Sequence, residues 1–436
     1  MPVPGTSQVP ASGSSSPDAP HGDCVLLKHG EVYLKGGNRH MFTHRLLDNL
    51  RHALDDLSGP TWVRTRRNVT VIGGDVPLDE LTARARQVIG FNAVEPAARV
   101  PSTEEAITAA VLDALGTARA ERPGITFAVR VKRRDKAFPM TGTDFARVLG
   151  ARAQEALDGL PVDLSHPDVR VSVEIDQDVS YVSWRRLPGL SGLPVGSSGR
   201  ALALLSGGFD SPVAAHRAMR RGLRVDYVHF TGAPYTNPAS LYKAYALARE
   251  LNRYQPGGRM YVVALGKAQK RLALAGADRL QVVAQRRLMV RTASALARRA
   301  RSEALVTGDS LGQVASQTVA NMAAVDEAAT LPVLRPLLGW EKQEIIDEAR
   351  SLGTAEISVL PDEDCCQLLA PPRVTTRAPM RELRTVERRL EIDEIVEELL
   401  STVQILRPGR DATPEGPSEG AADCATEPTT TPVPSA

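Results

Sequence analysis

The sequence predicts an α/β protein with an open parallel sheet in its C-terminal half and smaller α+β layers before it. From residue 200 onward, short apolar segments alternate regularly with helical segments, as in a parallel sheet built from repeated strand–helix units. Strands and helices also alternate between residues 24 and 187, which indicates α+β layers. The Gly-, Pro- and Ser-rich segment 188–199 lies between these regions and is typical of a linker at a domain boundary.

Length and composition favour two to four folded domains, since 436 residues are divided at roughly 100–200 residues per domain. No stretch reaches the roughly 18 consecutive apolar residues of a membrane span, and the N-terminus lacks the basic start and apolar centre of a signal peptide. Four scattered cysteines are too few for a disulfide framework, so we expect a cytoplasmic protein without a membrane partner.

The charge is distributed unevenly. The net charge of +2 rises to +8 for residues 24–407, which suits a polyanionic partner, although charge that only maintains solubility would look the same. Residues 1–22 and 408–436 are rich in Pro, Ser, Gly and Thr and poor in bulky apolar side chains. Because they cannot bury enough surface to offset chain entropy, we expect both to be disordered.

The N-terminal half is expected to contain these elements in order. The strands are 24–36, 62–73 (read as one continuous strand), 125–133, 169–176 and 179–187, with a connecting stretch at 91–101; the helices are 38–57, 78–89, 103–118 and 142–157.

The C-terminal half is expected to carry five parallel strands with helices between them. The strands are 201–205, 224–230, 260–265, 303–308 and 333–337. A single charged amphipathic helix over 380–405 closes the fold, and it could pack within the chain or form a homodimer contact. Ligands of such sheets bind beyond the carboxyl ends of the strands.

The segment 206–211, SGGFDS, follows the first of these strands and predicts a phosphate site. Two glycines let the backbone turn sharply and approach a ligand, and Pro212 suits the first turn of a helix. The unpaired N–H groups of that turn and the helix dipole point at one place. The alternative is an ordinary strand–turn–helix corner capped by Ser211. The Walker pattern GxxxxGK[ST] is absent.

A second polar turn, 306–318, ends another strand of the predicted sheet. Here Gly308 would permit close approach to a nucleotide, Asp309 could hold a magnesium ion or a ribose, and Gln317 offers amide hydrogen bonds. The alternative is that Asp309 and Ser310 only cap a helix.

Three more residues are candidates for contact with a nucleotide. His229 and Phe230 end the second strand, where a ring can flank an adenine, although Phe230 is equally well explained as core. Arg286 lies on an arginine-rich helix and would clamp a phosphate, whereas charged helix faces are usually just solvated.

A basic strand and an adjacent cysteine pair complete the candidate sites. Basic side chains interleaved with aromatics are typical of RNA backbone contacts. Cys365 and Cys366 could carry sulfur, or be buried structural cysteines; no CxxC spacing or nearby His supports a metal site. The basic candidates are Arg130, Lys132, Arg133, Arg134 and Lys136.

The SGGFDS string resembles the loop of the PP-loop ATPases, which adenylate a substrate oxygen and expel pyrophosphate. Taken with LKHGEVYLKGGNRHMF, FAVRVKRRDKAFP, VHF, RRLMVR and TGDSLGQVASQT, it makes residues 24–400 similar to the tRNA sulfurtransferases that form 4-thiouridine, also known as thiamine-biosynthesis sulfurtransferases. The resemblance is to a short form without the rhodanese-like domain of longer members. It implies a ferredoxin-like domain (24–78), a THUMP-like RNA-binding domain (79–187), a linker (188–199) and a PP-loop ATP-binding domain (200–405).

The resemblance also implies site residues and a mechanism. Asp210, Cys365 and Cys366 would be catalytic, ATP with Mg²⁺ would adenylate O4 of uridine-8 in tRNA, and persulfide sulfur would then displace AMP. A cysteine desulfurase would supply the sulfur, and a sulfur carrier protein of thiamine synthesis is a second acceptor that the sequence leaves open. The ATP contacts would be Leu204, Leu205, Ser206, Gly207, Gly208, Asp210, Ser211, His229, Phe230, Arg286, Gly308 and Gln317.

Two rival functions stay open at this point. Another PP-loop enzyme that adenylates a different tRNA base or a small substrate would share the SGGFDS loop. From a different class, a catalytically inactive THUMP-type RNA-binding protein would keep the basic strand alone. Cys424, in the C-terminal tail, is expected to be an incidental thiol rather than a mobile sulfur carrier.

Overall fold

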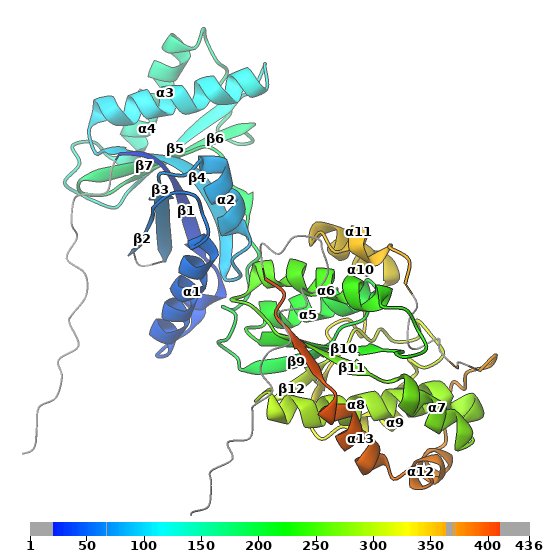
Figure 1. The fold of residues 1–436 in the computed structure, drawn as a ribbon. Coiled ribbons are helices and arrows are strands. Elements are labelled where there is room, and N and C mark those ends of the chain that lie inside the picture. The colour runs from blue at the N-terminus through cyan, green and yellow to red at the C-terminus, as the bar shows by residue number, and fades with distance from the viewer. Residues whose placement is uncertain (1–20, 67, 363–368, 370, 410–436) are drawn as a thin grey trace, which may run out of the picture. The chain divides into compact units, whose positions relative to one another are not determined.

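The structure is a computed structural model that describes residues 21–66, 68–362, 369 and 371–409. The chain forms two compact units, which are described separately (Figure 1). The first comprises the described residues up to Lys28 together with Leu57–Ala83 and Ala93–Pro188. The second comprises His29–Asp56, Arg84–Asn92 and the described residues from Gly189 onward. Among the described residues, no helix has both the length and the apolar character that crossing a bilayer requires.

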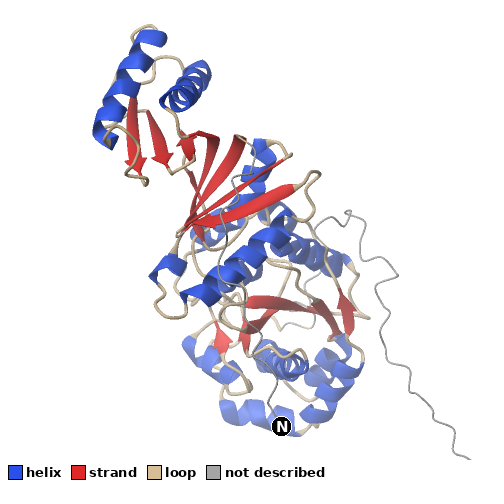
Figure 2. Cartoon of the chain, turned by 90° about the vertical axis from the view of Figure 1, so that its left-hand side faces the viewer, coloured by secondary structure: helices blue, strands red, loops and turns tan. Residues whose placement is uncertain are grey.

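The first unit is built on an eight-stranded sheet in the order β2-β3-β1-β4-β7-β6-β5, with β8 paired to β4. Helices α3 and α4 pack together against β5, β6 and β7, where Phe127, Phe145 and Val173 are buried in one core (Figure 2). The elements are β1 (Gly22–His29), β2 (Thr61–Arg66), β3 (Val69–Gly74), α2 (Leu78–Arg86), β4 (Phe91–Pro101), α3 (Glu104–Glu121), β5 (Phe127–Arg133), α4 (Gly142–Ala156), β6 (Val169–Ile175), β7 (Val179–Ser183) and β8 (Leu187–Pro188).

The single strand predicted over 62–73 is wrong. The chain reverses there into the antiparallel pair β2 and β3, with Arg66 opposite Val69. The reversal falls within the polar run from Arg64 to Asn68, which contains no Gly or Pro, so the segment lacks the strongest turn signals between the two strands.

The second unit contains a six-stranded sheet in the order β13-β12-β9-β10-β11-β14. The pairs from β13 to β11 are parallel, as predicted, and β14 is antiparallel to β11. The strands are β9 (Arg200–Leu204), β10 (Arg224–Thr231), β11 (Met260–Ala264), β12 (Ala304–Val306), β13 (Val333–Leu334) and β14 (Gln404–Leu406).

Helices cover both faces of this sheet (Figure 1). One buried cluster joins one face to α8 and α13, and another joins the opposite face to α5 and α6. The helices of this unit are α1 (Arg39–Leu54), α5 (Asp210–Arg220), α6 (Ala239–Leu251), α7 (Gly266–Leu274), α8 (Gln281–Arg299), α9 (Val319–Asp326), α10 (Lys342–Ser351), α11 (Ala355–Ser358), α12 (Met380–Arg388) and α13 (Ile392–Ser401).

The single closing helix predicted over 380–405 is also wrong. Helices α12 and α13 are separated at Glu391, whose φ of 45° lies in the left-handed region, and α13 is followed by the edge strand β14. Leu383 of α12 and Leu399 of α13 are buried in the same core cluster. The break thus lets two short helices bury their apolar sides where one straight helix would diverge from the core.

Candidate functional site

The loop between β9 and α5 folds back on the start of the helix. The Ser206 N–H donates to Ser211 Oγ at 2.9 Å, and the Gly208 N–H donates to Ser206 Oγ at 3.3 Å. Ser211 therefore closes the loop instead of capping α5, whose N-cap residue, Phe209, makes no side-chain cap bond. The first N–H groups of α5 have no carbonyl partner within the helix, so the loop and the helix start together form a candidate anion site.

A cavity of about 440 Å³ opens beside this loop at the carboxyl ends of β9 and β12. This volume suits a nucleotide-sized ligand. One end is polar, and the remaining wall is apolar, with Val282, Met289 and Val374 among its residues. The predicted nucleotide contacts that line it are Leu204, Ser206, Asp210, Ser211, Arg286, Gly308 and Gln317.

A smaller cavity of about 60 Å³ contains most of the other predicted contacts. Leu205, Gly207, His229 and Phe230 line it, and it shares Leu204, Ser206 and Met289 with the larger cavity. His229 Nδ1 lies 2.8 Å from the Leu205 carbonyl oxygen, so the imidazole supports the strand end that leads into the loop. Gly208 is exposed on the surface of the loop.

Asp309 is surrounded by cations at the base of the larger cavity. It forms an ion pair with Arg286, accepts from Arg335 Nε at 3.1 Å and from Thr307 Oγ1 at 2.9 Å, and lies 3.4 Å from Gln317 Nε2. Burial raises the pKa of Asp309, but Arg286, Thr307 and Arg335 together lower it below its ordinary value. Protein donors thus occupy both oxygens of the Asp309 carboxylate. It orients Arg286 and is not available to bind a magnesium ion or a ribose. In the described parts of the chain, no cluster of His, Cys, Asp and Glu could hold a metal ion.

Asp210 forms an ion pair with a lysine that the sequence analysis did not predict. Lys342 Nζ, at the start of α10, lies 2.7 Å from Asp210 Oδ1, and Gln313 Nε2 lies 3.2 Å from Oδ2. Lys342 is far from Asp210 in sequence and belongs to no local motif, so only the packing of α10 against α5 reveals it. An ammonium group paired with Asp210 therefore lies beside the start of α5.

Gly308, which lines the larger cavity, also has a structural role that the sequence did not predict. A Cβ at this position would lie 2.7 Å from the Ser211 backbone nitrogen and 2.8 Å from the Asp210 carbonyl carbon. Because real Cβ atoms do not approach backbone so closely, only glycine lets the polar turn pack against the start of α5. Gly308 fixes the shape of the anion site.

The segment just before the predicted cysteines is bonded to α6 and packs against the SGGFDS loop. Lys243 of α6, whose side chain is 6% exposed, donates to the Leu360 carbonyl at 2.6 Å and lies 3.0 Å from Asp362 Oδ1. Asp362 in turn packs against Gly207 and lines the smaller cavity. Lys243 was missed because a buried lysine has no signature in an amphipathic helix.

The predicted sulfur-carrying residues Cys365 and Cys366 lie outside the described residues, as does Cys424. Cys24 is described and buried, and burial raises the pKa of its thiol to about 12. It stays protonated at neutral pH and is unsuited to sulfur transfer.

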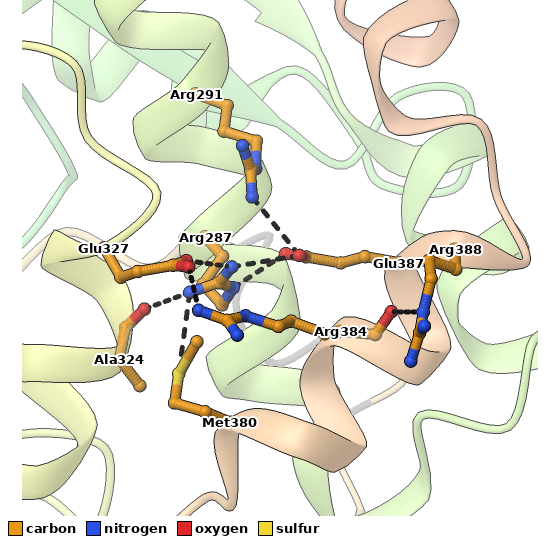
Figure 3. Close-up of polar contacts among 8 residues, drawn as sticks. All are labelled: Arg287, Arg291, Ala324, Glu327, Met380, Arg384, Glu387 and Arg388. Atoms are coloured by element: carbon orange, nitrogen blue, oxygen red, sulfur yellow. Dashed lines mark hydrogen bonds and ion pairs between the residues drawn. The ribbon is translucent and has the colours of Figure 1, made fainter.

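Adjacent arginines of α8 point in different directions. Arg286 faces the cavity, whereas the Arg287 side chain is fully buried and anchors α12 (Figure 3). Arg287 Nε and Nη2 donate to the two oxygens of Glu387 at 2.7 and 2.9 Å, Nη2 also lies 2.7 Å from Glu327, and Nη1 donates to the Ala324 carbonyl. Arg287 thus has a structural role.

The predicted RNA-binding residues lie on and after β5, the edge strand of the first unit's sheet. Arg130 donates to the Leu164 carbonyl at 3.1 Å, Arg133 donates to the Phe138 and Met140 carbonyls, and Arg134 pairs with Glu174. Only Lys132 and Lys136 are exposed without a partner among the described residues.

Comparison with known proteins identifies matches along most of the chain. Residues 24–94 match the ThiI ferredoxin-like domain, residues 101–185 match the THUMP domain, and residues 196–392 match the family described as "Thiamine biosynthesis protein (ThiI)".

The relatives share one name. A probable tRNA sulfurtransferase of Nocardia farcinica is 58% identical over 89% of this chain and 95% of its own length. A probable tRNA sulfurtransferase of Thermus thermophilus is 40% identical over 91% of this chain and 97% of its own length. The crystal structure of a 4-thiouridine synthetase–RNA complex with bound ATP superposes with a TM-score of 0.81 and 28% identity, covering 88% of this chain and 99% of the other.

Proposed function

Because the chain belongs to the family of tRNA sulfurtransferases, we propose that it uses ATP to convert uridine-8 of tRNA to 4-thiouridine. The observation that carries the proposal is the convergence of three features on the SGGFDS loop and the two cavities beside it. These are the anion site of the SGGFDS loop, the fixed guanidinium of Arg286 and the tie to the segment of Cys365. ATP supplies the activating group, and the tRNA base supplies the oxygen to be replaced.

In the first step, O4 of the uridine attacks the α-phosphorus of ATP, the P–O bond to pyrophosphate breaks, and pyrophosphate leaves. The apolar wall around Val282, Met289 and Val374 suits the adenine. The N–H groups at the start of α5 and the charges of Arg286 and Lys342 stabilise the negative charge on the phosphates. Asp309 contributes by orienting Arg286.

In the second step, the outer sulfur of a persulfide attacks C4, and the C4–O bond breaks as AMP leaves. A thiolate then breaks the remaining S–S bond, which leaves 4-thiouridine and a disulfide for cellular thiols to reduce. Cys365, or its neighbour Cys366, would carry or resolve the persulfide. A cysteine desulfurase is the donor in this proposal, and a sulfur carrier protein of thiamine synthesis is a second acceptor.

The two carboxylates that line the larger cavity do not fit a magnesium ion. Asp309 is paired with Arg286 and Arg335, and Asp210 lies between Lys342 and Gln313. Mg²⁺ therefore enters this proposal only as a counterion on the phosphates of ATP.

In the first unit, Lys132 and Lys136 remain exposed for tRNA phosphates. Arg130, Arg133 and Arg134 are bonded to their own domain and would mainly hold the surface in shape. A THUMP match in the same region supports this assignment of RNA contact.

The test is thiolation of a tRNA transcript by the full chain with ATP, cysteine and a cysteine desulfurase, followed by nucleoside digestion. We expect 4-thiouridine together with equimolar AMP and pyrophosphate, and no product from a transcript with cytidine at position 8. Cys365→Ser and Cys366→Ser variants, tested singly, assign the sulfur carrier. AMP formation that does not require tRNA would favour a small-molecule adenylating enzyme, and absence of AMP with tRNA would favour an inactive RNA-binding protein.

A further inference from the structure

A strongly basic segment lies beside the nucleotide cavity and has no role in the chemistry above. Between residues 373 and 389 the chain carries six arginines and two glutamates, a net charge of +4, which exceeds the +2 of the whole chain. We name five of these arginines the arginine strip. Its members are Arg373, Arg377, Arg381, Arg384 and Arg388, and all five are exposed.

The strip lies on one side of α12. Arg381, Arg384 and Arg388 have the i, i+3, i+7 spacing of one helix face, while Leu383 and Val386 are buried in the core on the other. Such spacing presents guanidinium groups in a row about 10 Å long, at 1.5 Å per residue. All three side chains are exposed on the second unit.

The strip borders a hollow of about 600 Å³ between α8, α12 and the start of α13. Arg291, Arg381, Arg384 and Arg388 line it. The acidic groups at its rim are Glu391 and Asp393, and Glu387 lies on its wall.

Two of the acidic groups beside the strip, Glu387 and Glu327, are paired with arginines (Figure 3). Arg287 donates to both carboxylate oxygens of Glu387, and Arg291 Nη2 lies 3.2 Å from Glu387 Oε2. Glu327 is shared between Arg287 and Arg384. Arg373, Arg377 and Arg381, in contrast, have no side-chain partner in the part of the chain that the structure describes. The strip thus has guanidinium groups ready for an outside anion.

The strip is held in place next to the nucleotide cavity. Val374, between Arg373 and Arg377, is part of the cavity wall. Asn321, at the start of α9, donates to the Ala315 carbonyl of the cavity turn at 3.0 Å and to the Thr375 carbonyl at 2.9 Å. An anion on the strip would therefore lie close to the site of adenylation.

We infer that the arginine strip is a docking surface for the phosphate backbone of tRNA on the ATP-binding unit. The inference rests on the proposed function, because tRNA is the polyanion that must approach this cavity. Guanidinium groups bind phosphate oxygens in a bidentate manner, and a fixed row of them suits a repeating chain of phosphates. The first unit's lysines then provide only part of the tRNA contact.

The test compares two variants of the full chain with equal loss of charge. The strip variant carries Arg377→Gln, Arg381→Gln and Arg388→Gln. The control variant carries Arg253→Gln, Arg271→Gln and Arg299→Gln, which are exposed arginines of the same unit paired with Glu250, Glu398 and Glu397. The Kd for a tRNA transcript is measured from 50 to 200 mM salt, with thermal unfolding and ATP binding as checks of folding.

We expect the strip variant to bind tRNA roughly tenfold more weakly or worse near 150 mM salt, with the slope of log K against log salt reduced by about 1 per arginine. The control should change the slope far less, and ATP binding should match wild type in both. Equal slopes in the two variants would overturn the inference.

A protein partner is the competing occupant. If tRNA binding is unchanged but thiolation from a protein persulfide falls while thiolation from free sulfide persists, the strip binds an acidic protein and the inference is wrong. Because the readout is tRNA binding by itself, failure of the wild-type chain to make 4-thiouridine would refute the proposed function without deciding the role of the strip.

Discussion

Lys342 Nζ lies 2.7 Å from Asp210 Oδ1, across a gap of more than a hundred residues, and places an ammonium group beside the start of α5. We expect Lys342→Gln to lower the rate of AMP formation about 100-fold, because one donor to developing phosphate charge is lost. Single-turnover AMP release with tRNA measures this. Gln343→Ala, one residue along the same helix, is the matched control, and a loss confined to tRNA affinity would contradict the assignment.

Gly308→Ala should destabilise the protein by about 1–3 kcal/mol, because the new methyl group would overlap the backbone of Ser211. ATP affinity should fall with it, since the start of α5 must shift. Thermal unfolding and ATP titration measure the two effects. The control is Gly339→Ala, where a Cβ meets no atom within 4 Å. Equal melting temperatures in the two variants would show that the turn adapts.

Arg287→Met should cost about 3–5 kcal/mol of unfolding free energy, because Glu387 loses its buried partner. The exposed pair of Arg299 and Glu397 provides the comparison, and Arg299→Gln should cost less than about 1 kcal/mol. Chemical denaturation measures both. The role of Arg287 as the anchor of α12 would be refuted by similar costs.

The Arg286–Asp309 pair predicts a specific pH dependence. The pKa of Asp309 in the folded protein is below its ordinary value, so its ionised form stabilises the fold above the unfolded-state pKa of about 3.9. The difference in unfolding free energy between wild type and Asp309→Asn should be constant above about pH 5 and shrink as pH falls below that value. Denaturation at several pH values measures it; a difference independent of pH down to pH 3 would argue against the pairing.

Lys243→Met should separate the two chemical steps. Lys243 holds Leu360 and Asp362 against the Gly207 turn but does not line the larger cavity. We expect pyrophosphate release to stay within about twofold of wild type, while 4-thiouridine formation falls about tenfold or more. Lys267→Met, at the start of α7, is the control. Parallel losses in both steps would mean that Lys243 supports adenylation instead.

Local signals were sufficient for the strand–loop–helix around SGGFDS and for the parallel sheet, because apolar runs, glycines and the position of Pro212 report local backbone preferences. They failed at 62–73 and 380–405, where the chain reverses or breaks without Gly or Pro. The enzymatic activity was inferred from the family resemblance and not from the periodicity of the sequence.

The site was predictable where its residues belong to one segment, and not where they meet across the fold. Ser206 and Ser211 are neighbours in one turn, whereas Lys342 reaches Asp210 only through packing of α10 on α5. Asp309 illustrates a second limit. Its position after a strand suggested a magnesium or ribose ligand, and it does line the cavity, but the arginines that occupy its carboxylate are distant in sequence.

Asn321 joins the turn that borders the nucleotide cavity to the segment that carries the arginine strip. Two ligands bound at the ends of such a link are positively coupled if both bind more tightly to the same arrangement of it. If ATP raises the affinity for tRNA by some factor through Asn321, then tRNA raises the affinity for ATP by the same factor. One side-chain amide would then make each substrate the other's effector, so that the activating nucleotide is held most tightly when the RNA is present to use it.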